Sequence, residues 1–251
     1  MRIDVWSDVV CPWCYIGKRR LEKAIADGGF GSQVEVVWHS FQLDPSARND
    51  DPRDLAERLG AKYGGGREFG LKANAQVTGV AAEDGLEFHF EHAKPANTVD
   101  AHRLLHLALD LVEAGELPAN GQDQLKERLL RAYFTEGEAV GDHATLTRLA
   151  VEAGLPENRV TEVLAGREYA DDVAADQAQA VAYGANGVPF FVIDQKYGVS
   201  GAQPVEVFDE VIRKALAERS PITIVAGAGA TDLGKDADGT DGACGPDGCA
   251  I

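Results

Sequence analysis

An α/β fold with a large helical insertion is predicted by three features of the sequence. Strand-like residues open the chain, strand-like residues return after Gly187, and a long span of helical periodicity separates the two. Neither end has enough strands to form a stable sheet by itself, so the two ends should pair around the insertion. We therefore predict an α/β domain of residues 1–48 and 186–219, a helical insertion domain of residues 49–185, and a flexible tail of residues 220–251.

The start of the chain has the pattern of a strand, a helix and a second strand. Residues 2–7 (RIDVWS) alternate polar and apolar side chains, which is typical of a strand. A helix follows over residues 12–26, because Pro12 suits the first helical position and the glycines at 28 and 29 end helices. Residues 34–38 (VEVVW) predict the second strand and complete the opening of a β-α-β unit.

The central span, residues 55–184, has an almost purely helical pattern. Apolar side chains recur at helical spacing, for example at Leu104 and Ala108 or at Leu125 and Leu129. Helix starts are predicted at Asn97, at Asp142 with its neighbour His143, and at Pro156. These helices make up the predicted insertion.

Strand patterns return near the end of the chain. We predict a buried strand over residues 188–193, a turn over 194–197, a short partner strand over 197–200 and a last helix from Pro204 to about Arg219. From Ser220 onward the residues are mainly Gly, Ala, Asp and Thr, which offer little apolar surface to bury. This composition predicts the flexible tail, which ends in Cys244-Gly-Pro-Asp-Gly-Cys249.

Composition and charge exclude several classes of protein. The 251 residues are 45% apolar and 26% charged, as in ordinary globular proteins, and the formal net charge is −17. So acidic a chain is a poor match for nucleic acid or an anionic membrane surface. No apolar stretch approaches the roughly 18 residues that a membrane span needs, and the first residues lack the apolar core of a signal peptide. We therefore expect a cytoplasmic protein, in which cysteine pairs are typically catalytic, redox-sensing or metal-binding.

The segment Cys11-Pro12-Trp13-Cys14 is the strongest indication of chemistry. It follows a predicted strand and begins a predicted helix, where unpaired amides and the helix dipole favour a thiolate at Cys11. Cys14 lies one turn further along the same face, where it can attack a mixed disulfide formed at Cys11. A zinc half-site and a pair of inert buried thiols are the alternatives, and the strand-to-helix context favours redox chemistry over both.

The segment Gly187-Val188-Pro189-Phe190 is the second indication. A proline that opens a buried strand must lie where no ladder N–H is needed. With a cis Val188–Pro189 bond, the Val188 backbone would face the cysteine pair and could pair with a bound peptide or thiol. An ordinary trans proline at a strand start is the alternative, because only about 5–6% of such bonds are cis.

Together these segments resemble a known family. DVVCPWCYIGKRRLE near the start, a long helical insertion, and then NGVPFFVID and SGAQP are similar to the DsbA-like thioredoxin superfamily, and most of all to its FrnE branch. The resemblance covers about residues 1–219. It implies a thioredoxin fold interrupted by a helical domain, a cis Pro189, a nucleophilic Cys11 and a resolving Cys14. We assign substrate binding to Pro12, Trp13, Val188 and Pro189.

The resemblance also brings in a second enzyme class. The 2-hydroxychromene-2-carboxylate isomerases and kappa-class glutathione transferases share this frame but typically carry Ser where Cys11 stands, and use it to activate glutathione. Both thiols are present here, so disulfide exchange is the better interpretation. Glutathione is still a candidate co-substrate, because the Gly201-Ala202-Gln203 turn lies where relatives hold its γ-glutamyl part. A turn that only starts the last helix is the alternative.

Other titratable residues are weaker candidates. His102 and His106 are four residues apart on one helix face with Asp100 nearby, which could form a metal pair, although packing or capping roles are favoured. We expect Lys18, Arg19 and Arg20 to form a solvated helix face and His39 to be structural. We predict no resident metal and no resident cofactor.

The leading hypothesis is therefore a cytoplasmic thiol–disulfide oxidoreductase or isomerase that acts on a protein or small molecule with a thiol or disulfide and exchanges electrons with a cellular thiol reductant. The alternatives are a glutathione-dependent isomerase or transferase, and an interaction module held by zinc on all four cysteines. Cys244 and Cys249 flank a good turn sequence, so we predict that they form a second redox pair on a tether. An inert tail and a metal clip are the alternatives for this segment.

Overall fold

A mixed β-sheet joins the two ends of the described chain. The computed structural model describes residues 1–219, and within them the sheet has the strand order β2-β1-β3-β4. The strands are β1 (Arg2–Ser7), β2 (Glu35–Ser40), β3 (Phe190–Ile193) and β4 (Tyr197–Ser200). β1 pairs parallel with β2 and antiparallel with β3, so that Val5 lies opposite Phe191. The prediction that the two β-containing ends pair around an insertion is confirmed.

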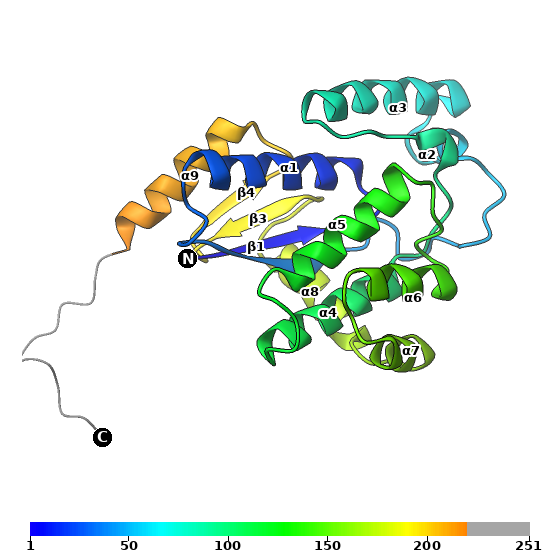
Figure 1. Ribbon diagram of the computed structural model, residues 1–251. Coiled ribbons are helices and arrows are strands. Elements are labelled where there is room, and N and C mark those ends of the chain that lie inside the picture. Colours follow the sequence, from blue (N-terminus) through cyan, green and yellow to red (C-terminus); the bar gives the residue numbers. More distant parts are fainter. Residues whose placement is uncertain (220–251) are drawn as a thin grey trace, which may run out of the picture. The chain divides into compact units, whose positions relative to one another are not determined.

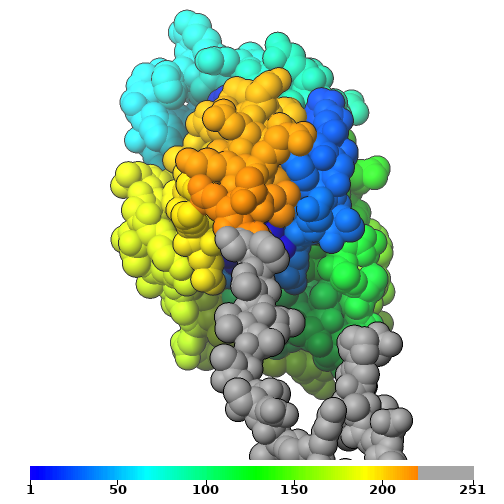
Figure 2. All heavy atoms as spheres, turned by 90° about the vertical axis from the view of Figure 1, so that its left-hand side faces the viewer, coloured from blue at the N-terminus to red at the C-terminus, as the bar shows by residue number. Residues whose placement is uncertain are grey.

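Each face of the sheet is covered by different helices (Figure 1). Ile3 and Val5 of β1 pack with α1 (Pro12–Asp27) and α9 (Val205–Glu218) in one apolar core. Figure 2 shows the orange residues of α9 beside the blue residues of α1. Trp6 points to the opposite face and packs with Ala180 of α8. This alternation along β1 follows from the two-residue period of a strand.

The insertion is helical, as predicted, and its apolar core also takes in Val9, Tyr15 and Ile16 from the start of the chain. Its elements are α2 (Leu55–Tyr63), α3 (Gly66–Glu83), the short 3-10 helix η1 (Phe90–His92), α4 (Val99–Glu113), α5 (Gly121–Phe134), α6 (His143–Glu152), α7 (Glu157–Ala165) and α8 (Ala170–Ala182). Residues 84–98 differ from the prediction, because η1 is their only helix. The rings of Phe88 and Phe134 stack at 4.6 Å, so aromatic packing between distant residues fixes this segment, which helical periodicity does not describe.

The predicted element starts are close to those observed. Asp142 caps α6 by accepting a hydrogen bond from the Thr145 amide, and α7 follows Pro156. α4 begins at Val99, whose amide donates to the Asn97 side chain at 3.1 Å. β3 begins at Phe190, two residues later than the predicted 188, because Pro189 has no N–H to give to the ladder.

Residues Met1–Glu218 form one compact unit. The predicted boundaries of the insertion at 49 and 185 stay a prediction. The predicted tail of residues 220–251, with Cys244 and Cys249, lies outside the described residues. Of the helices described, none is long and apolar enough to cross a membrane.

Candidate active site

Cys11 and Cys14 lie at the start of α1, directly after the loop that leaves β1. Cys11 is the residue that precedes the first helical position, and Pro12 occupies that position as predicted. Both cysteines are free thiols and both are buried, with 3% and 1% of their surface exposed. Trp13, between them, is 38% exposed and gives the site its accessible apolar surface. The structure thus shows the reduced, dithiol form.

The Val188–Pro189 segment lies against Cys11. Its peptide bond is cis, as the resemblance implied. The Cys11 thiol donates a hydrogen bond to the Val188 carbonyl, with the sulfur 3.6 Å from the oxygen. The expected bond from the first turn of α1 to the Cys11 sulfur is absent, because Cys11 makes no side-chain cap bond in this structure.

A glycine permits the close approach of α1 to this segment. A Cβ on Gly17 would lie 3.0 Å from the Cγ of Pro189 and 3.1 Å from the ring of Phe191. Gly201 is also close, since its amide donates to the Pro189 carbonyl at 2.8 Å. The Gly201-Ala202-Gln203 turn therefore lies beside the Val188–Pro189 segment, within reach of a ligand bound there.

The two thiols differ in their surroundings. Burial raises the pKa of Cys14 well above its usual range, and a hydrogen bond with Cys11 and the charge of Cys11 raise it further. The positive charge of Lys126 acts in the opposite direction. Cys14 is therefore a protonated thiol in the dithiol form. Its ionisation is favoured by the positive charge of Lys126 and would be favoured further by loss of the charge on Cys11.

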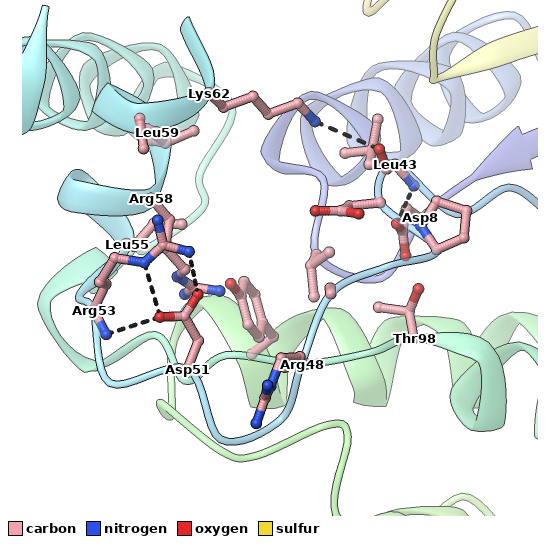
Figure 3. Close-up of a pocket in the computed structure, with 17 residues that line it drawn as sticks. Asp8, Leu43, Arg48, Asp51, Arg53, Leu55, Arg58, Leu59, Lys62 and Thr98 are labelled. Carbon is pink, nitrogen blue, oxygen red and sulfur yellow. Dashed lines mark hydrogen bonds and ion pairs between the residues drawn. The ribbon is translucent and has the colours of Figure 1, made fainter. Parts of the chain in front are cut away.

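A buried acid–base pair lies beneath the cysteine loop. Asp8 is 1% exposed, and one of its carboxylate oxygens lies 3.2 Å from Nε2 of His102. The other oxygen accepts from the Leu43 amide at 2.8 Å (Figure 3). Burial acts to raise the pKa of Asp8, but the hydrogen bond and charge of His102 outweigh it and lower the pKa. Burial also lowers the pKa of His102. His102 is therefore a buried residue that forms a hydrogen bond with Asp8.

Lys126 of α5 is a site residue that the sequence analysis missed. Its side chain is fully buried, its Nζ lies 3.5 Å from the Ser7 carbonyl oxygen and 5.6 Å from the centre of the Trp38 ring. Burial lowers its pKa to about 8, although the charges of Cys14, Asp8 and Cys11 oppose the change. The sequence held one indication, because residue 126 lies on the apolar stripe that continues through 130 and 133.

The prediction of a solvated basic face after the cysteines is wrong for Lys18. Its side chain is 2% exposed and forms ion pairs with Glu22, with Asp123 at 3.2 Å and with Glu127 at 2.9 Å. Arg19 also binds Glu127, at 2.7 Å. A helix of the insertion supplies the two distant carboxylates, so a local sequence pattern could not show that this helix face is covered.

Arg20 likewise links separate parts of the chain. It pairs with Asp84 at 2.8 Å and donates to the Ala202 carbonyl at 2.8 Å. The Ala202 carbonyl belongs to the turn beside the Val188–Pro189 segment. Arg20 therefore fixes that turn to α1.

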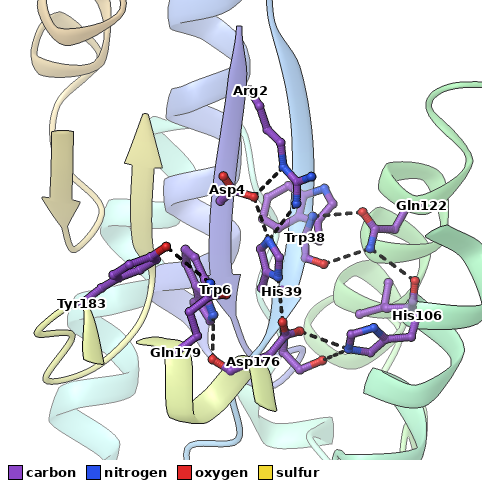
Figure 4. A network of polar contacts seen from close by, with 12 residues as sticks. Arg2, Asp4, Trp6, Trp38, His39, His106, Gln122, Asp176, Gln179 and Tyr183 are labelled. Atoms are coloured by element: carbon purple, nitrogen blue, oxygen red, sulfur yellow. Dashed lines mark hydrogen bonds and ion pairs between the residues drawn. The ribbon is translucent and has the colours of Figure 1, made fainter. Parts of the chain in front are cut away.

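His39 and His106 belong to a polar network on the sheet (Figure 4). His39 lies 2.8 Å from both Asp4 and Asp176, and its predicted structural role is confirmed. His106 lies 3.0 Å from Asp176 rather than beside His102 in a shared site. Within residues 1–219, the structure contains no group of three or more His, Cys, Asp or Glu side chains arranged to hold a metal.

The comparisons with known proteins agree with this geometry. The model of the DSBA-like thioredoxin domain family matches residues 2–213. The chain belongs to this family. The crystal structure of a probable DsbA oxidoreductase from Streptomyces coelicolor is 42% identical, with a TM-score of 0.80, and covers 100% of this chain and 99% of its own. The uncharacterized protein YwbO of Bacillus subtilis is 30% identical over 84% of this chain and 96% of its own length.

A more distant structure shares the fold alone. The cytosolic disulfide reductase DsbM from Pseudomonas aeruginosa, in its structure with GSH, is 18% identical, with a TM-score of 0.59 over 86% of this chain and 100% of its own. The DsbA-like fold is that of thiol–disulfide oxidoreductases, and in this chain it carries the two thiols at the start of α1.

Proposed function

We propose that this protein is a cytosolic thiol–disulfide oxidoreductase of the FrnE type, in which the Cys11–Cys14 dithiol reduces or exchanges disulfides of proteins or small molecules. One observation carries the proposal: two free thiols lie one turn apart at the start of α1, with Cys11 against the Val188 carbonyl. A helix start favours the thiolate, and the Val188 backbone offers an edge for an extended substrate.

The chemistry proceeds in two exchanges. The Cys11 thiolate attacks one sulfur of the substrate disulfide, which forms a mixed disulfide and releases the first substrate thiolate. Cys14 then loses its proton and attacks the Cys11 sulfur, which forms the Cys11–Cys14 disulfide and releases the second substrate thiolate. The substrate gains two electrons that the dithiol loses, and a cellular thiol reductant restores the dithiol.

The difference between the two thiols supports this division of roles. Cys14 is the deeper thiol and burial raises its pKa, so Cys11 is the better first nucleophile. The second exchange requires the Cys14 thiolate. Lys126 favours that thiolate, because its positive charge lowers the pKa of Cys14. We therefore assign Lys126 the role of stabilising Cys14 as it ionises.

The test uses paired substitutions. Cys14→Ser leaves a nucleophile without a resolving thiol, so a mixed disulfide at Cys11 should accumulate with substrate and appear as a mass shift that reductant reverses. Cys11→Ser should abolish insulin reduction. Full insulin reduction by Cys11→Ser would overturn the assignment, and conjugation of glutathione to an electrophile without insulin reduction would favour the isomerase or transferase class.

Glutathione is the proposed thiol co-substrate, and the turn at Gly201 beside Pro189 is where it would lie. Cys244 and Cys249 are proposed as a second redox pair that exchanges electrons with Cys11 and Cys14. The cytosol is the proposed compartment, and fractionation of cells that express the protein measures it.

A further inference from the structure

A cavity of about 540 Å³ opens beside the loop that leads to Cys11. Asp8 and Val10 of that loop form one wall, and Val10 is joined directly to Cys11. Arg53, Arg58 and Lys62 lie on the opposite side, at and before α2, as Figure 3 shows. The volume is in the range of pockets that bind small molecules, and Val10, the chain neighbour of Cys11, is one of the residues that line the cavity.

Most charged groups around the cavity already have polar partners, including Asp44, whose carboxylate accepts hydrogen bonds from Ser46. Arg53 binds Asp51 at 2.6 Å and Arg48 binds Asp50 at 2.9 Å. Lys62 donates to the Leu43 carbonyl at 3.4 Å. The Asp8 carboxylate is held by His102 and by the Leu43 amide.

Arg58 is only partly paired. Its Nε and Nη2 are buried and have no hydrogen-bond partner among the described residues. Hydrogen bonds from Arg53 are the main reason that the pKa of Asp51 is lowered, and the charge of Arg58 makes a smaller contribution. The charge of Arg58 and a side-chain hydrogen bond between Arg58 and Tyr133 oppose the rise that burial causes in the pKa of that phenol, so only Nε and Nη2 of the guanidinium are without a partner. A guanidinium with free donors in such a place is a ready partner for a carboxylate.

The start of α4 reinforces the positive character of the cavity. Thr98, which precedes the fifteen-residue helix α4, lines the cavity and makes no side-chain cap bond. The first amides of a helix and its dipole attract anions. In a chain with a net charge of −17, carboxylates are abundant, so an Arg that none of them binds points to a partner from outside.

We propose that this cavity binds a carboxylate carried by the disulfide substrate, through Arg58, and that small acidic disulfides are therefore preferred over neutral ones. The proposal rests on the proposed function. Cys11 attacks the substrate disulfide and Cys14 closes the ring, as in the two exchanges above, while Arg58 holds the carboxylate and takes no part in the covalent steps.

The test compares two chromogenic disulfides that react without any added reductant. Dithiobis(nitrobenzoate) carries a carboxylate on each ring, and dithiodipyridine is uncharged. Both are mixed with the full-length reduced protein in which Cys244 and Cys249 are replaced by Ser, so that only Cys11 and Cys14 react. The variants are Arg58→Gln, Arg58→Lys and the control Arg48→Gln, which removes a paired and exposed cation from the same cavity.

We expect Arg58→Gln to slow the reaction with the acidic disulfide about ten- to hundredfold and to leave the neutral disulfide within about twofold. Arg58→Lys should recover part of the loss, and Arg48→Gln should match the parent. Insulin reduction should be unchanged in Arg58→Gln, because the carboxylate belongs to a small substrate.

Equal effects on the two disulfides, or no effect on either, would overturn the proposal, and a matching loss of insulin reduction would overturn the assignment to small acids. The neutral disulfide also shows whether the variant has kept a folded site. Failure of the proposed function would look different, because the parent protein would then react with both disulfides no faster than an ordinary thiol.

Discussion

Replacement of Lys126 by Met should make the protein more stable and a slower catalyst. Lys126 is fully buried, and its pKa falls from 10.5 to about 8. One pH unit corresponds to about 1.36 kcal/mol, so the protonated side chain costs the folded state about 3 kcal/mol at neutral pH. Met has a similar length and no charge. We therefore expect Lys126→Met to raise the free energy of unfolding by about 2–3 kcal/mol at pH 7.

The sign of the pH dependence follows from the lowered pKa. Between pH 8 and 10.5 the unfolded chain binds a proton at Lys126 that the folded chain does not. The stability of the wild-type protein should therefore rise with pH across that range, relative to Lys126→Met. Below pH 8 both states bind the proton, and the difference between the two proteins should be constant. Urea denaturation of both proteins at pH 7, 9 and 10.5 measures this difference in unfolding free energy.

The catalytic loss should fall on the second exchange. A nearby opposite charge changes a pKa by about 1–3 pH units, so loss of Lys126 should slow the release of the mixed disulfide at pH 7 about tenfold or more. The rate should recover as pH rises, which a purely structural defect would not cause. Formation of the mixed disulfide at Cys11 should change less.

The matched control is Lys23→Met, which removes an exposed lysine of α1 that pairs with Asp27 at 2.9 Å. It should leave both the stability and the release rate essentially unchanged, because exposed ion pairs contribute little. Our reasoning would be refuted if Lys126→Met were less stable than the wild type at pH 7, or if its release rate and pH profile matched the wild type.

Two further predictions concern the rest of the molecule. Asp176→Asn should lower the free energy of unfolding by about 2–4 kcal/mol, because Asp176 lies 2.8 Å from His39 and accepts from the Ser40 amide at 2.7 Å. Burial acts to lower the pKa of His39, but the hydrogen bonds to Asp176 and Asp4 outweigh it and raise that pKa. The protonated His39 is therefore stabilised by Asp176, and the loss of unfolding free energy in Asp176→Asn, measured by urea denaturation, should shrink as pH rises through the pKa of His39. Deletion of residues 226–251 should slow turnover with a cellular reductant and leave turnover with a small dithiol unchanged. If the truncated and full-length proteins turned over at the same rate with each reductant, the proposed second redox pair would have no role.

The polar network of His39 shows what a sequence pattern cannot supply. β1 provides Asp4, β2 provides His39, and α8 provides Asp176, so the three side chains meet only after the sheet has formed and the insertion has packed on it. The same applies to Lys18, whose ion pairs with Asp123 and Glu127 cover a helix face that looks solvated in the sequence. The spacing of charged residues in a sequence does not show which distant residue will pair with them.

The sequence by itself determined the order of strands and helices, the dithiol at Cys11 and Cys14, and the proline segment that faces it. These depend on local chemistry, because the apolar period, the preference of Pro for a first helical turn and the spacing of two cysteines act within a few residues. Only the tertiary structure decided the electrostatics of the site. Lys126 and Ser7 are 119 residues apart in sequence, and Lys126 reaches the cysteine loop because α5 packs there. Burial then sets its charge, since the cost of a charge depends on everything that surrounds it.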